Sequence, residues 1–178
     1  MKIKELRKAT EEVSIFTPGE ITRIWEAKDT NIYYSVILMY IYTGCRKSEL
    51  LNLKKTEVDI PGRCFNILEA KTEAGIRTVP IAEKVVPFFE YWYNLNDCEY
   101  LLSTPEGCHS NFYDKHIAPL FKTLETKRNI HDTRHTCLAL LATAGVDERI
   151  VNDIVGHRNY TNLERAEMAE MLDAINKI

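Results

Sequence analysis

An uninterrupted run without a charged side chain, Tyr33 to Tyr42, constrains the fold of this chain most strongly. Because Gly44 follows closely and glycine is common just beyond helix C-termini, we predict a buried helix over residues 31–42. The run is much shorter than the roughly 20 apolar residues that span a bilayer. The N-terminus also has no apolar signal segment, so we expect a cytoplasmic protein that makes no membrane contact.

The chain has 178 residues, of which 45% are hydrophobic, enough for one sizeable core and too few for two. Thr17, Pro18 and Glu20 form a capping-box pattern that predicts a helix ending near Ala27. Further helices are predicted over residues 47–53, 83–94, 110–126, 132–144 and 147–155, the last two ended by Gly145 and Gly156. Alternating residues 64–69 and 77–81 around a turn predict a β-hairpin. We therefore predict a mainly helical α+β domain with one small antiparallel sheet.

The net charge and the cysteine content exclude few classes of function. The net charge of −3 does not by itself indicate a nucleic-acid partner. In residues 115–135, the basic side chains (Lys115, Lys122, Lys127, Arg128, Arg134) outnumber the acidic ones (Glu125, Asp132). This stretch could therefore face phosphate, or it could be an ordinary solvated surface. The five cysteines (Cys45, Cys64, Cys98, Cys108, Cys137) include no C-x-x-C pair, so we expect reduced, mostly buried thiols and no metal.

Two arginines stand in motifs that suit phosphate binding. Arg46 lies in TGCRKSEL (residues 43–50), between a glycine and a predicted helix start. Arg134 lies in HDTRHT (residues 131–136), where it shares one face of a helix N-terminus with His131. A planar guanidinium binds two phosphate oxygens at once. Taken alone, Arg46 beside Glu49 is more commonly a surface ion pair.

Two further motifs place a lysine and a histidine. AKT (residues 70–72) leads into RTVPI (residues 77–81), with Lys71 on the predicted turn, from which an amine can protonate a leaving oxygen. VGH (residues 155–157) places His157 after a glycine turn. We expect His135 and Thr136 to pack and hydrogen-bond within their own helix.

In this order and spacing, the motifs resemble the T-G-x-R-x-x-E-L, K-T-x-x-x-x-R-x-V-P-L, H-x-x-R-H-T and L-G-H boxes of the tyrosine recombinase (phage integrase) family. The resemblance implies an integrase-type catalytic domain that performs site-specific recombination of double-stranded DNA, without metal or cofactor. A tyrosine would form a 3′-phosphotyrosyl link and free a 5′-hydroxyl. The resemblance assigns phosphate binding to Arg46, Arg134 and His157, protonation of the leaving oxygen to Lys71, and assistance to His131 and His157.

The nucleophile departs from the family pattern. The family's tyrosine usually stands where this chain has Ala166 or Glu167, and no tyrosine follows Tyr160. Three explanations are compatible with the sequence. Tyr160 is the nucleophile on a shortened connector, or Ala166 replaces the tyrosine in an inactive DNA-binding derivative, or a segment of the natural protein is absent between Asn162 and Ala166. Tyr160 is also compatible with an ordinary half-buried residue at the cleft rim.

The resemblance extends from about Thr17 to the end, so we expect a catalytic domain over residues 15–178. Residues 1–14 are charged and poorly periodic, as in a linker from an N-terminal DNA-binding domain outside this chain. The spacing of Met168, Met171, Leu172 and Ile175 predicts an amphipathic helix that binds a neighbouring protomer on DNA or packs on its own domain.

A type IB topoisomerase shares the chemistry, but the short chain and the T-G-x-R box argue against it. With its net charge, this chain should bind DNA weakly and with a steep salt dependence.

Overall fold

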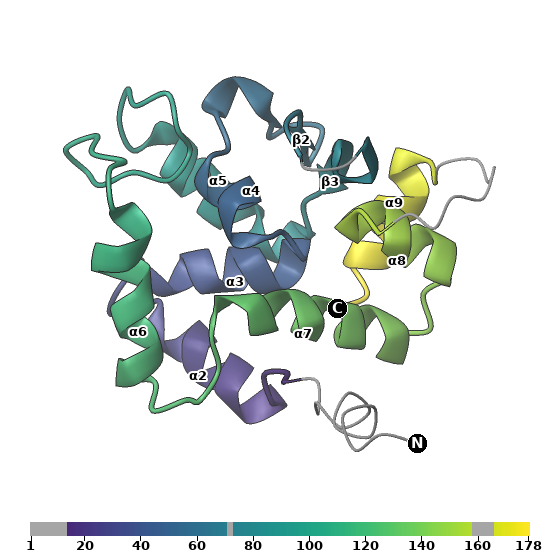
Figure 1. Ribbon diagram of the computed structural model, residues 1–178, viewed down its shortest axis with the longest axis horizontal. Coiled ribbons are helices and arrows are strands. Elements are labelled where there is room, and N and C mark those ends of the chain that lie inside the picture. The colour runs from purple at the N-terminus through teal and green to yellow at the C-terminus, as the bar shows by residue number, and fades with distance from the viewer. Residues whose placement is uncertain (1–13, 71–72, 158–165) are drawn as a thin grey trace, which may run out of the picture.

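The computed structural model describes residues 14–70, 73–157 and 166–178 (Figure 1). The α-helices are α2 (Pro18–Ala27), α3 (Tyr34–Thr43), α4 (Lys47–Leu51), α5 (Val86–Asn94), α6 (Ala118–Thr123), α7 (Ile130–Thr143), α8 (Glu148–Val155) and α9 (Met168–Ile175). An antiparallel sheet has the order β1 (Val58–Asp59), β2 (Cys64–Ile67), β3 (Arg77–Pro80). The predicted mainly helical α+β class with one small sheet is confirmed. The predicted linker lies outside the described residues except for Ser14, and stays a prediction.

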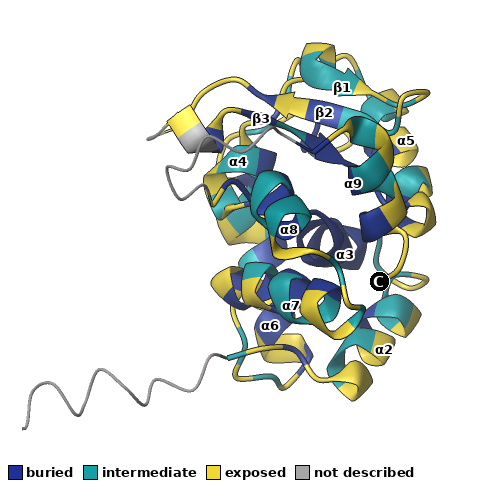
Figure 2. Ribbon diagram, turned by 90° about the vertical axis from the view of Figure 1, so that its right-hand side faces the viewer, coloured by how far each residue is buried: buried dark blue, intermediate teal, exposed yellow. Residues whose placement is uncertain are grey.

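Helix α3 forms the centre of the core. Every residue from Tyr34 to Thr43 is buried. Figure 2 shows this helix end-on, with the sheet above it and α7 and α2 below. The buried hydroxyl groups of Thr43 and Ser35 on this helix are hydrogen-bonded: Thr43 donates to the Met39 carbonyl at 2.7 Å, and Ser35 accepts from Trp92 at 3.0 Å. The predicted buried helix is confirmed, although it begins at Tyr34 rather than at residue 31.

Local capping sets the ends of the helices that carry the motifs. The capping box at Thr17 and Glu20 is present, with each side chain accepting from the other residue's amide. Helix α7 begins at Ile130, two residues earlier than predicted, because Asn129 accepts from the His131 amide and Asp132 accepts from the Asn129 amide. Residues 131–136 therefore lie in the first two turns of α7.

Prolines and short strands account for the wrong boundaries. The predicted helix over residues 110–126 is a π-helix (Tyr113–Ile117) followed by α6, with Pro119 in the first turn of α6. The predicted helix over residues 83–94 is likewise a 3₁₀ turn (Glu83–Val85) followed by α5, with Pro87 in its first turn. Helix α4 ends at Leu51, and the sheet gains β1, which is too short to show a pattern.

Gly44 allows the C-terminus of α3 to approach two other helices. Its φ of 64° is in the left-handed region that favours glycine. A Cβ atom here would lie 3.0 Å from Cγ1 of Val155 in α8 and 3.1 Å from Sγ of Cys137 in α7. Gly44 therefore fixes where the chain leaves α3 on its way to Arg46.

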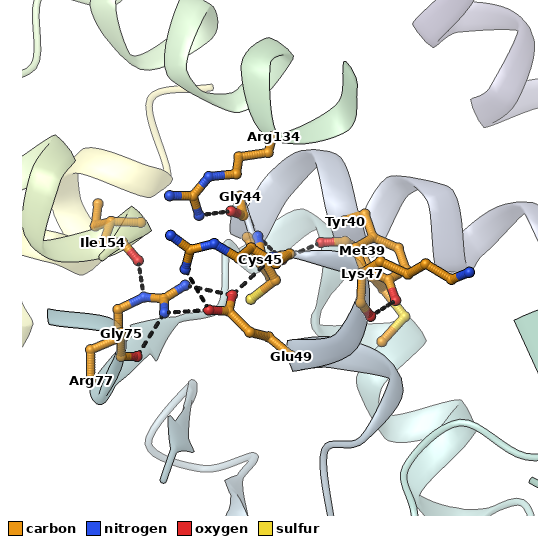
Figure 3. Close-up of polar contacts among 12 residues, drawn as sticks. Met39, Tyr40, Gly44, Cys45, Lys47, Glu49, Gly75, Arg77, Arg134 and Ile154 are labelled. Atoms are coloured by element: carbon orange, nitrogen blue, oxygen red, sulfur yellow. Dashed lines mark hydrogen bonds and ion pairs between the residues drawn. The ribbon is translucent and has the colours of Figure 1, made fainter. Parts of the chain in front are cut away.

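A buried ion pair ties the sheet to α4 and α8 (Figure 3). Arg77 of β3 donates to both carboxylate oxygens of Glu49 at 3.0 Å, and the two side chains are 5% and 6% exposed. Its remaining donors bind the carbonyl oxygen of Ile154 in α8 at 2.8 Å and that of Gly75 at 2.9 Å. Burial alone would raise the pKa of Glu49, but the hydrogen bonds and charge of Arg77, together with the donors of Arg46, lower it below its usual value.

The C-terminal helix α9 packs on its own domain, against α8 and β3. Met171 and Ile175 are buried, while Met168 and Leu172 are partly buried. Arg149 of α8 also pairs with Glu170 of α9 at 3.1 Å. In the part of the chain that the structure covers, no helix combines the length and apolar character needed to cross a membrane.

We predict that Glu49→Gln lowers the free energy of unfolding by about 3 kcal/mol at pH 7, because it leaves the buried Arg77 without its counter-charge. The pKa of Glu49 is lower in the folded than in the unfolded protein. The contribution of the Glu49 carboxylate to the free energy of unfolding is therefore present above pH 4.5 and is lost as the pH falls through the folded-state pKa. Urea unfolding from pH 7 to pH 3 should show a smaller acid-induced loss in the variant. Glu170→Gln, at an exposed pair, is the control, and equal losses in both variants would contradict the prediction.

Candidate functional site

A cleft of about 980 Å³ opens where α4, the β2–β3 hairpin and the start of α7 meet. Its walls carry bases from two distant motifs and two carboxylates: Arg46, Lys47, His131, Arg134, His135, Glu49 and Glu69. TGCRKSEL and HDTRHT, far apart in sequence, thus face the same cavity, as predicted for Arg46, His131 and Arg134. Among the described residues, no group of three or more His, Cys, Asp or Glu side chains is placed to hold a metal ion.

Arg46 lies at the start of α4 with 44% of its side chain exposed. Its Nη1 donates to Oε1 of Glu49 at 2.8 Å, and its backbone amide donates to Oε2 of Glu49 at 2.8 Å. Arg46 therefore forms the ion pair that the sequence allowed for and also lines the cleft. Since Glu49 binds Arg46 and Arg77 together, the orientation of Arg46 depends on the buried pair beneath it.

Arg134 has an unsatisfied donor at the cleft wall. Its Nη1 donates to the carbonyl oxygen of Gly44 at 2.8 Å (Figure 3). Its Nη2 is buried and has no hydrogen-bond partner within the described part of the chain. Burial, followed by the positive charges of Arg46 and Arg77, lowers the pKa of Arg134 to about 10, which leaves it charged at neutral pH. An anion in the cleft would supply both the missing acceptor and the missing counter-charge.

The three histidines of the motifs, His131, His135 and His157, lie near the two arginines of the cleft. His131 and His135 are exposed and line the cleft. His157 follows Gly156, whose φ of 74° ends α8, as the motif predicted. Desolvation, then the charges of Arg134, Arg46 and Arg77, lower the pKa of His157. The imidazole of His157 therefore lies within the field of the arginines and is mainly neutral at pH 7.

Two predicted site residues, Lys71 and Tyr160, lie outside the described residues. Glu69 and Ala70, which directly precede Lys71, line the cleft. The hairpin therefore brings the chain to the cleft edge just before Lys71. The roles of both residues stay predictions.

Some sequence expectations need correction. Thr136 is buried and hydrogen-bonded, as expected, but the packing role expected for His135 is wrong because this side chain is exposed at the cleft. Within the basic stretch, Arg128 pairs with Glu20 at 3.4 Å and binds Ser14, whereas Arg134 lines the cleft.

All five cysteines are free, as expected, but only Cys45 and Cys137 are buried, so the expectation of mostly buried thiols is wrong. Burial raises the pKa of Cys45 to about 11 and that of Cys137 to about 12. At neutral pH both thiols stay protonated. They therefore act as small packing groups beside the arginines.

Sequence reasoning missed Arg77 as part of this region. It identified the residue only as a member of the hairpin motif. The available signal was the strand pattern, since alternation places Arg77 on the same face as the buried Val79. An arginine on the inward face of a strand needs a buried acid, which Glu49 provides.

Comparisons with known proteins agree with this geometry. The phage integrase family profile matches residues 14–166. A XerC-like tyrosine recombinase of Caldanaerobacter subterraneus subsp. tengcongensis is 26% identical over 214 residues, which cover 94% of this chain and 55% of that protein. The crystal structure of XerA recombinase superposes with a TM-score of 0.70 at 25% identity, covering 85% of this chain and 61% of that one.

A second solved structure, the Tn1549 transposon integrase in complex with transposon right-end DNA, has a TM-score of 0.68 at 21% identity. The match covers 93% of this chain and 62% of that one. This chain thus spans less than two thirds of the length of these three proteins. The family profile covers most of its residues, and the chain belongs to the phage integrase family, as a catalytic domain of the tyrosine recombinase type.

Proposed function

We propose that this chain performs site-specific recombination of double-stranded DNA in the cytoplasm, as the catalytic domain of a phage or mobile-element integrase. The observation that carries the proposal is the buried, unpartnered Nη2 of Arg134 beside Arg46 in an open cleft. Two guanidinium groups at the wall of one cleft can together bind the non-bridging oxygens of one phosphate of a DNA strand. The Tn1549 integrase, a structural neighbour, was solved with DNA, which supports DNA as the partner.

The chemistry needs the residue types that line the cleft. In-line attack on a phosphodiester builds negative charge on the two non-bridging oxygens, and fixed cations stabilise this charge without a metal. Arg46 and Arg134 would donate to these oxygens, with His131 and His157 assisting. Neutral His157 can donate one hydrogen bond, and a bound phosphate would favour its protonated form.

The covalent steps are those that the family resemblance implies. The Tyr160 hydroxyl would give its proton to a neutral imidazole among the assisting histidines, and its oxygen would attack phosphorus, forming the 3′-phosphotyrosyl bond and breaking the bond to the 5′ oxygen. That oxygen would take a proton from Lys71 and leave as a hydroxyl. Because the phosphotyrosyl link keeps the energy of the broken bond, another 5′-hydroxyl can attack it and rejoin DNA without ATP.

A second candidate function is DNA binding without cleavage. It is favoured by Ala166, whose side chain is buried and whose amide donates to the Asp153 carboxylate at 2.6 Å. This position therefore offers a methyl group where the family usually has a tyrosine. If Tyr160 on a shortened connector is the nucleophile, this chain forms a covalent link. If Ala166 replaces the tyrosine, or the segment that carries it is absent, this chain forms none.

We also propose that copies of the domain associate on DNA, since strand exchange joins two duplexes. Helix α9 is the candidate contact. Its interface with α8 combines the Arg149–Glu170 pair and apolar side chains, so the same interface could form between neighbouring protomers.

We predict that Arg134→Met weakens binding to a short DNA duplex about 10- to 100-fold, the range for losing a charge-assisted hydrogen bond. Loss of one phosphate contact should also reduce the slope of log K against log salt by about 1. Fluorescence anisotropy at several salt concentrations measures both quantities. Arg23→Met is the matched control, because Arg23 also donates to one carbonyl group, that of Leu124, away from the cleft. Equal effects in both variants would count against the phosphate site.

We predict that incubating the protein with sheared genomic DNA of its host yields a covalent adduct on Tyr160. Pooled fragments avoid the need to know the target sequence. Denaturing electrophoresis detects the adduct, and peptide mass spectrometry locates the phosphotyrosyl residue. Tyr160→Phe should abolish the adduct, while Tyr113→Phe, which changes another tyrosine, should not. Normal duplex binding without any adduct would favour the non-cleaving function.

A further inference from the structure

Arg77 contacts α4, the turn between β2 and β3, and α8, which lie next to the predicted catalytic residues Arg46, Lys71 and His157, but it does not itself line the cleft. Its carboxylate partner, Glu49, also holds the amide and guanidinium of Arg46. Its second partner, the Ile154 carbonyl, lies three residues before His157 in the last turn of α8. Its third partner, the Gly75 carbonyl, lies in the turn between β2 and β3.

We propose that Arg77 is a positioning residue that holds Arg46, His157 and the hairpin turn in one fixed arrangement around the scissile phosphate. The inference rests on the proposed function, because it assigns a role toward the phosphate of that site. Arg77 would act through Glu49 and through the end of α8. With 5% of its side chain exposed, it does not bind DNA directly.

The contacts require a guanidinium. Arg77 donates from Nε to Ile154, from Nη1 and Nη2 to Glu49, and from Nη1 also to Gly75, which is possible because the guanidinium is a rigid fork with five N–H donors. A lysine would keep the charge beside Glu49, but its single nitrogen cannot reach Glu49, Gly75 and Ile154 with the same geometry. The substitution Arg77→Lys therefore separates the positioning contacts from the charge.

A role in stability alone makes a different prediction. If Arg77 only stabilised the fold, a folded variant would bind DNA as tightly as the wild-type protein. A positioning residue weakens binding of a folded protein even when its charge is kept, as in Arg77→Lys, and the salt slope then stays unchanged.

The test measures binding of a short DNA duplex by wild-type protein, Arg77→Lys and Arg23→Lys, at a temperature where circular dichroism shows all three folded. Arg23 is the matched control, because its guanidinium also donates to a backbone carbonyl group, that of Leu124, but lies away from the cleft. Arg77→Lys should bind about tenfold more weakly, the order expected when a residue that supports a preorganised site is changed, with an unchanged salt slope. Wild-type affinity in Arg77→Lys would overturn the proposal.

A second measurement needs no DNA and keeps the proposal testable if binding is too weak. Amide hydrogen exchange should increase in Arg77→Lys at Arg46, whose amide is bound to Glu49, and also at Gly156 and His157, whose amides bind the Asn152 carbonyl. Arg23→Lys should leave the exchange of the Arg46 amide unchanged. Faster exchange confined to β3 would overturn the proposal. If the wild-type protein failed to bind duplex while exchange increased at both sites, the proposed function would fail and the coupling through Arg77 would stand.

Discussion

The carboxylate of Glu49 accepts four hydrogen bonds, two from Arg77 and two from Arg46, and the functional cleft depends on this interaction. A buried carboxylate is costly unless its oxygens are paired, and here both oxygens bind donors from two segments far apart in the sequence. The arrangement fixes Arg46 at the start of α4, and Arg77 extends it to α8. Since α8 ends at Gly156, the position of His157 follows from the same group of contacts.

Close packing at Gly44 completes the arrangement on the other side of the cleft. Because the left-handed residue has no Cβ, α7 and α8 approach the end of α3, and Arg134 reaches the Gly44 carbonyl. Three arginines thus gather around one acid, which leaves a local excess of positive charge in a chain whose net charge is −3. Nη2 of Arg134 is left buried without an acceptor among the described residues. The local charge, and not the total charge, is therefore what would attract an anion to the cleft.

Sequence patterns were sufficient for the fold class, the buried helix, the capping box at Thr17 and the presence of Arg46, His131 and Arg134 at one cleft. These features depend on local periodicity, capping and motif spacing. The π-helix before α6 and the two-residue strand β1 could not be predicted, because neither has a local pattern of its own. The role of Arg77 also escaped prediction, since it depends on tertiary partners. The exposure of His135 depends likewise on how α7 faces the cleft.

We propose that Arg46, Arg134 and His157 bind one phosphate in line with a nucleophilic Tyr160. The most direct test is a crystal structure with sulfate soaked into the cleft, in which the distance from the sulfur atom to the Tyr160 hydroxyl is measured. The account predicts a sulfate bound by both arginines and His157, with the hydroxyl oxygen within about 4 Å, close to the range for attack. A sulfate bound elsewhere would contradict the phosphate site. A Tyr160 hydroxyl that points away from a correctly bound sulfate would contradict its role as the nucleophile.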